Sequence, residues 1–161
     1  MGEMAVKISK VNQEELLNLL QSAYAEEWLA YYQYWIGAKV AEGIKSSTVI
    51  EEFKEHADEE LKHADWLAER IIQLGGTPLL NPNDWEKYAK CKYDAPHIPD
   101  TKVLVNQNLI AERCAVGKYQ QICEFCQGKD YETFRISRKI LKEELEHEQE
   151  MQDLINDFKY Y

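Results

Sequence analysis

The positions of the helix-breaking residues constrain the fold of this chain most strongly. The 161 residues include 7 glycines and 4 prolines. They cluster between long segments in which apolar residues recur with the period of an α-helix. Segments of this kind predict an all-α chain. We expect four long helices, at residues 13–42, 48–74, 101–127 and 131–158.

The connections between the predicted helices differ in length. The first and last connections are short, whereas residues 75–99 separate the second helix from the third. This long connection contains a predicted short helix, with Asn81 as its N-cap and Pro82 at its first position. Simple up-down bundles have only short loops, so the pattern favours two helix hairpins joined by one long crossover. We expect residues 1–161 to form a single domain of this kind.

Local signals predict where some of these helices begin and end. Asn12 is a suitable N-cap for the first helix. Thr48 and Glu51 have the spacing of a capping box, which predicts that the second helix begins near residue 48. Gly75 and Gly76 then predict its end.

The charge of the chain limits its partners. Lys and Arg number 19 against 29 Asp and Glu, which gives a net charge of −10. Such a surface repels nucleic acid and anionic membranes and attracts cations, although it can also serve solubility alone. The sequence has no run of eighteen apolar residues, and residues 1–10 lack the apolar part of a secretory signal. We therefore expect a cytoplasmic protein that binds neither DNA nor a membrane.

Two Glu-x-x-His pairs are the strongest chemical signal in the sequence. Glu60 and His63 form one pair on the second predicted helix, and Glu144 and His147 form the other on the fourth. Residues three apart lie on one helix face, so each pair offers a carboxylate and an imidazole to one point. The apolar residues around both pairs place them on the core face. One such pair on a solvated helix would mean little, but two on core faces indicate a site.

One glutamate from each remaining helix would complete a carboxylate-bridged dimetal site. Glu27 is in line with the apolar positions of the first helix, and Glu112 with those of the third. A lone buried carboxylate is very costly, but several around divalent cations are neutralised. Adjacent glutamates compete for these roles, and we reject them because they fall off the apolar stripes: Glu26, Glu59 and Glu143.

The two halves of the chain also repeat. Glu-Glu-Leu-Lys-His at residues 59–63 matches Glu-Glu-Leu-Glu-His at residues 143–147. Glu27 precedes the first copy by nearly the same distance as Glu112 precedes the second. Two equivalent metal positions would need such a near-two-fold arrangement.

The donor types indicate the metal and the reaction. Carboxylates and imidazoles suit iron and manganese, whereas sulfur-rich sites suit zinc or iron–sulfur clusters. We predict two iron ions per chain, with manganese or zinc as alternatives. Hard anionic oxygens favour Fe(III) over Fe(II). We therefore predict a ferroxidase, in which hydrogen peroxide or oxygen takes one electron from each Fe(II).

These residues resemble the ferritin superfamily, and bacterioferritin in particular. The matching segments are Glu27 with Gln33-Tyr34, residues 56–70, Ala111-Glu112 and residues 140–144. The resemblance implies a ferritin-like four-helix bundle in which Glu60 and Glu144 bridge two irons. It assigns the terminal ligands as Glu27 with His63 on one iron, and Glu112 with His147 on the other.

The details favour a Dps-like subgroup known as thioferritins. Leu61 occupies the position of the haem-ligating methionine of bacterioferritin, so no haem is expected. Glu112-Arg113-Cys114-Ala115 resembles the thioferritin signature, with Cys91 in the crossover as the natural partner of Cys114. The resemblance implies a disulfide or redox pair at these cysteines. It also implies a homo-oligomer, a dodecameric shell that stores ferric iron and protects against oxidative stress.

Other residues have more than one reading. Tyr34 is either a hydrogen-bond or electron donor beside the site or a core aromatic, and His56 is either a neighbour of the ligands, an entry ligand or a core histidine. Cys123 and Cys126 are interpreted as small core residues, because no second pair would complete a zinc site. The first helix carries more aromatic side chains than one core stripe needs, which we interpret as a subunit interface: Tyr24, Trp28, Tyr31, Tyr32, Tyr34 and Trp35.

Other functions remain open from the sequence alone. The main alternative is a stand-alone di-iron or di-manganese enzyme, a peroxidase or catalase-like protein without storage. A DNA-compacting protein is a third hypothesis, which the acidic charge opposes. A helical interaction bundle without metal is the fourth.

Overall fold

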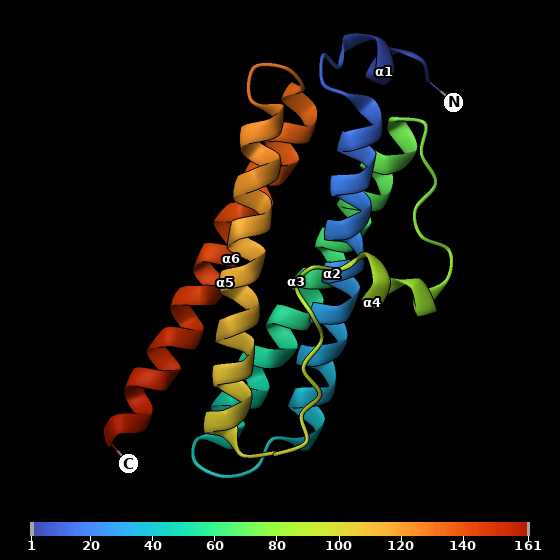
Figure 1. Ribbon diagram of the computed structural model, residues 1–161. Coiled ribbons are helices and arrows are strands. Elements are labelled where there is room, and N and C mark those ends of the chain that lie inside the picture. Colours follow the sequence, from blue (N-terminus) through green and yellow to red (C-terminus); the bar gives the residue numbers. More distant parts are fainter. Residues whose placement is uncertain (1, 161) are drawn as a thin grey trace.

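The computed structural model describes residues 2–160, which are mostly helical and contain no β-strand. The all-α prediction is confirmed. Four long helices form the bundle (Figure 1): α2 (Gln13–Val40), α3 (Ser46–Gln73), α5 (Thr101–Cys126) and α6 (Tyr131–Asp157). The shorter segments are α1 (Met4–Ile8), η1 (Pro82–Asp84), α4 (Trp85–Tyr88) and η2 (Phe158–Tyr160).

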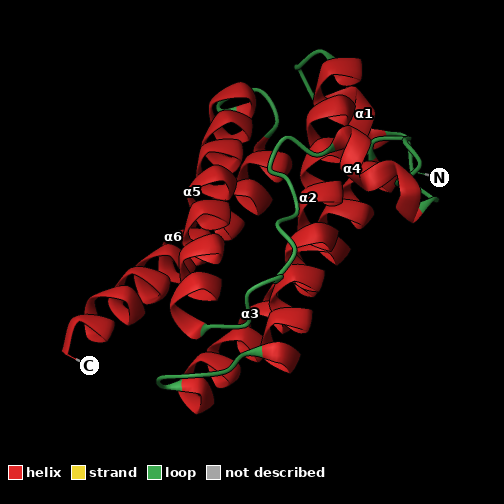
Figure 2. Ribbon diagram, turned by 60° about the horizontal axis from the view of Figure 1, so that its bottom comes forward, coloured by secondary structure: helices red, strands yellow, loops and turns green. Residues whose placement is uncertain are grey.

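The helices form two hairpins, α2 with α3 and α5 with α6, joined by the long crossover between α3 and α5 (Figures 1 and 2). The last part of the crossover runs along the bundle between α2 and α5. An isolated parallel bridge between Glu42 and Asp100 fastens its end to the end of α2. The backbone N–H of Glu42 donates to the carbonyl of Pro99 at 2.7 Å, and that of Thr101 donates to the carbonyl of Glu42 at 3.0 Å. The predicted crossover connectivity is confirmed.

Side-chain caps begin three of the long helices. The carboxamide of Asn12 accepts a hydrogen bond from the backbone N–H of Glu15, as predicted. The carboxylates of Asp100 and Asp130 cap α5 and α6 in the same way. In the crossover, Asn81 caps the turn that Pro82 begins, which confirms that prediction too.

The predicted capping box of the second helix is wrong. α3 begins at Ser46, so Thr48 and Glu51 lie inside the helix and form no capping box. Lys45 precedes the helix in a left-handed conformation (φ 56°), and its carbonyl already accepts from the backbone N–H of Val49 at 3.0 Å. Gly43 (φ 104°) supplies the preceding bend, in a conformation that costs glycine little. The tight turn therefore starts the helix earlier than the side-chain signal suggests.

The apolar core is divided into two clusters along the bundle. One cluster lies toward the ends of α2 and α6 that include Tyr34 and Met151. The other lies toward the opposite ends of these helices, around Leu20 and Ile140. Each long helix carries buried glutamate or histidine between its contributions to the two clusters. The fold therefore places a buried polar layer between two apolar clusters.

The aromatic residues of α2 are only partly available for a subunit interface. The indole of Trp28 stacks on that of Trp85 in α4, with ring centroids 5.2 Å apart and an interplanar angle of 5°. Tyr34 is buried in the core. Tyr32 and Trp35 stay exposed and stack on each other. The crossover thus covers some of the aromatic side chains of α2. The prediction of a subunit interface now rests on the two that stay exposed, Tyr32 and Trp35.

Two smaller observations complete the fold. Cys123 and Cys126 are buried free thiols, and burial raises the pKa of Cys126 to about 12, in keeping with a packing role. Across residues 2–160, no helix has the length and apolar character needed to cross a membrane.

Candidate metal centre

The polar layer brings together all six side chains that the sequence singles out as metal ligands. They come from the four long helices, and each is at most 3% exposed. The two residues of each Glu-x-x-His pair share one face of their helix, as their three-residue spacing predicts, and that face is buried. The set is Glu27, Glu60, His63, Glu112, Glu144 and His147.

One half of the centre surrounds Nδ1 of His63. This nitrogen lies 3.3 Å from Oε2 of Glu27, 3.2 Å from Oε2 of Glu60 and 3.1 Å from Oε1 of Glu144. The ligand atoms of these four residues all lie within 4.8 Å of one another. Such a group could hold one divalent cation.

The other half surrounds Nδ1 of His147. This nitrogen lies 3.5 Å from Oε1 of Glu60, 3.8 Å from Oε2 of Glu112 and 3.9 Å from Oε2 of Glu144. These four residues also form a group within 4.8 Å. Glu60 and Glu144 thus offer one oxygen to each half, which is the geometry of two bridging carboxylates.

Unsatisfied polar atoms show that a metal fits this space. Oε2 of Glu27, Oε2 of Glu112, both side-chain oxygens of Glu144 and Nδ1 of His147 are buried, and none has a hydrogen-bond partner within residues 2–160. Buried polar atoms without partners are costly and rare in native proteins. Divalent cations bound by these atoms would remove that cost.

Two glutamates that fall off the predicted ligand positions instead orient the histidines. Nε2 of His63 lies 2.8 Å from Oε2 of Glu143 on α6, and Nε2 of His147 lies 2.7 Å from Oε2 of Glu59 on α3. Each carboxylate therefore holds the histidine of the opposite helix with Nδ1 turned toward the centre. Contacts of this kind fix the tautomer of a metal-binding histidine and increase its basicity. The repeated Glu-Glu in the two motifs is the signal that could have revealed them.

Two buried tyrosines hold the carboxylates that lie farthest from the bridges. The hydroxyl of Tyr34 on α2 donates to Glu112, and that of Tyr119 on α5 donates to Glu27. The predicted role of Tyr34 as a hydrogen-bond donor beside the site agrees with this contact. Tyr119 follows Glu112 by two turns, as Tyr34 follows Glu27, and this spacing is the sequence signal for its role. Burial and the neighbouring glutamates raise the pKa of both tyrosines, so the hydroxyls stay protonated.

Burial and mutual repulsion favour protonation of several carboxylates in this group. Burial, followed by the charge of Glu60, raises the pKa of Glu27 to about 8 and that of Glu144 to about 7. Burial and the charge of Glu144 raise the pKa of Glu112 well above its usual range. Each of these groups must lose its proton to bind a cation.

The pKa values of the two histidines are raised too, and for an imidazole this favours the charged form. Burial disfavours the imidazolium of His147, but the nearby carboxylates of Glu60 and Glu112 raise its pKa to about 11. Burial also disfavours the imidazolium of His63, but the close carboxylates of Glu143 and Glu144 outweigh burial and raise its pKa. Burial also opposes the ionisation of Glu60, yet the two histidines hold its pKa well below the usual range. Protons on the histidines and on several carboxylates thus balance the negative charge of the centre, and bound cations would replace them.

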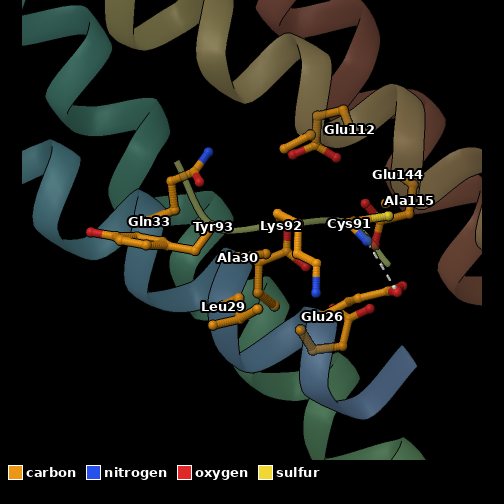
Figure 3. A pocket seen from close by; sticks show the side chains of 13 residues that line it. Glu26, Leu29, Ala30, Gln33, Cys91, Lys92, Tyr93, Glu112, Ala115 and Glu144 are labelled. Carbon is orange, nitrogen blue, oxygen red and sulfur yellow. Dashed lines mark hydrogen bonds between the residues drawn. The ribbon is translucent and has the colours of Figure 1, made fainter. Parts of the chain in front are cut away.

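The crossover closes one side of the centre with a disulfide. Cys91 is bonded to Cys114 on α5, with their Cα atoms 5.8 Å apart. A cavity lies beneath this segment, and Figure 3 shows Cys91, Glu112 and Glu144 among its lining side chains. The same cavity is lined by Glu27 and Glu60. The disulfide therefore lies beside the carboxylates of the candidate centre.

The position of Glu26 differs from the prediction that it lies off the core face. It is 6% exposed, and its carboxylate accepts from the backbone N–H groups of Lys90 at 2.7 Å and of Cys91 at 3.3 Å. Nζ of Lys118 lies 3.1 Å from the same carboxylate. The crossover brings N–H donors that the helix pattern of α2 alone does not reveal. Glu26 therefore anchors the crossover rather than joining the ligand set.

Comparison with known proteins gives the family. A model of the ferritin family, described as a ferritin-like domain, matches residues 17–160. The chain belongs to the ferritin-like family. The matched residues include all four long helices except the first residues of α2. The resemblance read from the ligand residues is thereby confirmed at the level of the family.

Individual relatives of this ferritin-like chain are similar over most of its length. It is 35% identical over 152 residues to the "DNA protection during starvation protein" of Pyrococcus furiosus, which covers 93% of this chain and 82% of the relative. It is 30% identical over 131 residues to the "Bacterial ferritin" of Pseudomonas aeruginosa, covering 81% and 77%. A solved structure of a dodecameric thioferritin, the bacterioferritin-related protein of Bacteroides fragilis, superposes with a TM-score of 0.97 at 48% identity and covers 99% of this chain and 96% of that one.

Proposed function

We propose that this ferritin-like chain is a di-iron ferroxidase that oxidises Fe(II) and stores the ferric product in a hollow oligomeric shell. The observation that carries the proposal is the shared position of Glu60 and Glu144, whose oxygens contribute to both four-residue groups. Two cations held by these common carboxylates would lie close enough to react with one oxidant molecule. Donors of this type suit iron.

The proposed ligand assignment follows from the two groups. Glu27 and His63 would hold one iron, Glu112 and His147 the other, and Glu60 and Glu144 would bridge them. Manganese or zinc could occupy the same donors.

The chain's own groups prepare the centre for oxidation. Four carboxylates against two Fe(II) favour the ferric state, in which the charge is higher. Tyr34 and Tyr119 hold two of these carboxylates, while Glu59 and Glu143 keep the histidine nitrogens aimed inward. Each Fe(II) gives one electron, so two Fe(II), one hydrogen peroxide and two protons yield two Fe(III) and two waters. Paired oxidation avoids release of hydroxyl radical, which supports a role in protection from oxidative stress.

Storage requires assembly, and the proposal extends to a dodecameric shell. The relative from Bacteroides fragilis is described as dodecameric and matches almost the whole of this chain. Exposed Tyr32 and Trp35 on α2 are suited to a subunit contact. Mass measurement by light scattering tests this part: a twelve-chain particle supports storage, and a dimer favours a stand-alone peroxidase or catalase-like enzyme.

The disulfide at the crossover supports a redox role for Cys91 and Cys114. It lies beside the carboxylates that would bind iron and contributes to the same cavity. We propose that the pair responds to the redox conditions under which iron is taken up or released.

A peroxide pulse after anaerobic Fe(II) loading tests the ferroxidase proposal. The Glu60→Ala/Glu144→Ala variant removes both bridges, and the Glu55→Ala/Glu146→Ala variant removes two exposed carboxylates from the same helices as a control. Rapid oxidation of two Fe(II) per chain is expected in the wild type and control, with loss in the bridge variant. Equally slow oxidation in all three would refute the proposal. Continued uptake with a growing ferric core would establish storage, whereas peroxide consumption without a core would favour the stand-alone enzyme.

A DNA-binding role deserves a separate test, because one relative is named for DNA protection. The net charge of −10 opposes association with DNA. We expect no shift of duplex DNA in a mobility assay at low salt; a stable complex would contradict this expectation.

A further inference from the structure

A second group of possible metal ligands lies outside the dimetal centre, between α3 and α6. Glu52 and His56 on α3 and Glu150 on α6 each offer one ligand atom, and these atoms lie within 4.8 Å of one another. Nε2 of His56 lies 2.8 Å from Oε2 of Glu150, across the two helices. None of the three belongs to the proposed ligand set of the dimetal centre.

His56 connects this outer group to the dimetal centre. Its ring is 1% exposed and stacks on that of His147, with centroids 4.0 Å apart and an interplanar angle of 18°. Its Nδ1 is buried without a hydrogen-bond partner in the described part of the chain. His56 also forms a group with Glu112 and His147 whose ligand atoms lie within 4.8 Å. The imidazole of His56 therefore belongs both to the outer group and to a group that includes two residues of the dimetal centre.

The internal repeat shows that His56 is not required by the two-fold arrangement. The Glu-Glu-x-x-His motif recurs in both halves, but the position that corresponds to His56 before the second motif is Ile140. A buried apolar residue therefore serves the same place in the other half. His56 adds an imidazole to only one half of the centre, the half that contains Glu112 and His147.

The chemistry of the outer group suits a transient cation. One imidazole and two carboxylates are donors for Fe(II), Mn(II) or Zn(II), and their two negative charges match one divalent ion. Three protein donors leave further positions to water. The side chain of Glu150 is 50% exposed and Glu52 is partly exposed, whereas His56 is buried. The group therefore extends from solvent to the wall of the dimetal centre.

We propose that Glu52, His56 and Glu150 bind a third divalent cation, Fe(II) under reducing conditions, and that this site delivers iron to the dimetal centre. Cation binding at the outer group stands on its own geometry. The delivery step rests on the proposed ferroxidase function. No electron transfer is assigned to the outer group, because its role is to capture and pass on an ion.

Binding is tested with Co(II), by equilibrium dialysis and metal analysis of the full-length protein. The test variant is Glu52→Gln/Glu150→Gln, which spares His56 because that ring packs on His147. The matched control is Glu55→Gln/Glu146→Gln, which removes the same charge from exposed positions on the same helices. Wild type and control are expected to bind three Co(II) per chain and the test variant two. Two Co(II) in the wild type, or three in the test variant, would overturn the proposal.

Anomalous diffraction from Co(II)-soaked crystals locates the third ion. A peak bounded by Glu52, His56 and Glu150 is expected in the wild type and absent from the test variant. A third ion bound elsewhere would overturn the assignment. The Glu60→Ala/Glu144→Ala variant separates the two proposals: it should lose the two central ions and keep the outer one, whereas loss of all three would mean that the outer group binds no ion independently.

Delivery is tested by the initial rate of Fe(II) oxidation when Fe(II) is scarce. The Glu52→Gln/Glu150→Gln variant is expected to oxidise scarce Fe(II) several-fold more slowly than the control. At excess Fe(II) it should still oxidise two Fe(II) per chain in the first phase. Equal rates for variant and control at scarce Fe(II) would refute delivery through this site.

Discussion

Replacing Glu143 by glutamine should weaken metal binding at one half of the centre and leave the other half nearly unchanged. Glu143 contacts Nε2 of His63 at 2.8 Å, and through that contact it fixes the direction of Nδ1. Its pKa is lowered mainly by this hydrogen bond to His63, so the group is a carboxylate at neutral pH. Glutamine keeps the length of the side chain but removes its charge.

The magnitude follows from what the contact does. Loss of a carboxylate that orients a metal-binding histidine costs about 10- to 100-fold in metal affinity. This corresponds to about 1.4–2.7 kcal/mol. Because Glu143 is partly exposed, water can replace part of the lost contact, and we expect the lower part of this range.

The near-two-fold arrangement supplies a matched comparison. Glu59 holds His147 as Glu143 holds His63, at 2.7 Å and with similar exposure. Glu59→Gln should therefore weaken the ion beside Glu112 and His147. An anaerobic Co(II) titration by calorimetry, with Glu146→Gln as the exposed control, should show one weakened site in each variant. Two equally weakened sites, or unchanged binding in both variants, would refute the orienting role.

Three further results are expected. Metal affinity should rise between pH 6 and 8, because Glu144 and Glu27, with pKa values raised to about 7 and about 8, must lose protons to bind cations; calorimetry in two buffers of different ionisation enthalpy should detect proton release, and its absence would contradict the raised pKa values. Tyr119→Phe removes the hydrogen bond to Glu27 and should weaken Co(II) binding by about 1–3 kcal/mol; unchanged affinity would show that the hydroxyl does not position the ligand. The Cys91→Ser/Cys114→Ser variant opens a loop with a sequence separation of 23 and should lose about 3 kcal/mol of unfolding free energy on the loop-entropy estimate; equal denaturant midpoints for oxidised wild type and variant would contradict it.

The ligand set was predictable because each part of it has a local signature. Glu60 with His63, and Glu144 with His147, need only the helical period and apolar neighbours to be placed on an inner face. The long helices follow from the same periodicity. The structure confirms that these faces meet, while the assignment of the residues as iron ligands remains a prediction.

The missed contacts all reach from one helix to another. Glu59 and Glu143 lie at the edges of their own apolar stripes, so the pattern of one helix cannot show that they contact histidines on the opposite helix. Tyr119 has the same core signature whether or not its hydroxyl contacts Glu27. Glu26 is buried only because the crossover covers it. Such pairings depend on tertiary packing, which the period of a single helix does not encode.

The start of α3 shows a different limit. Thr48 and Glu51 have a correct capping spacing, yet the preceding turn is tight enough to begin the helix at Ser46. The conformation of Lys45 decides the boundary, and lysine carries no strong signal for a left-handed residue.

Anaerobic Fe(II) loading of crystals, followed by anomalous diffraction at the iron absorption edge, tests the central claim most directly. We expect two iron peaks in each chain, one beside Glu27 and His63 and one beside Glu112 and His147. Carboxylate oxygens of Glu60 and Glu144 should lie between the peaks. A single peak, or iron found only at surface carboxylates while the six side chains stay unchanged, would contradict the dimetal centre.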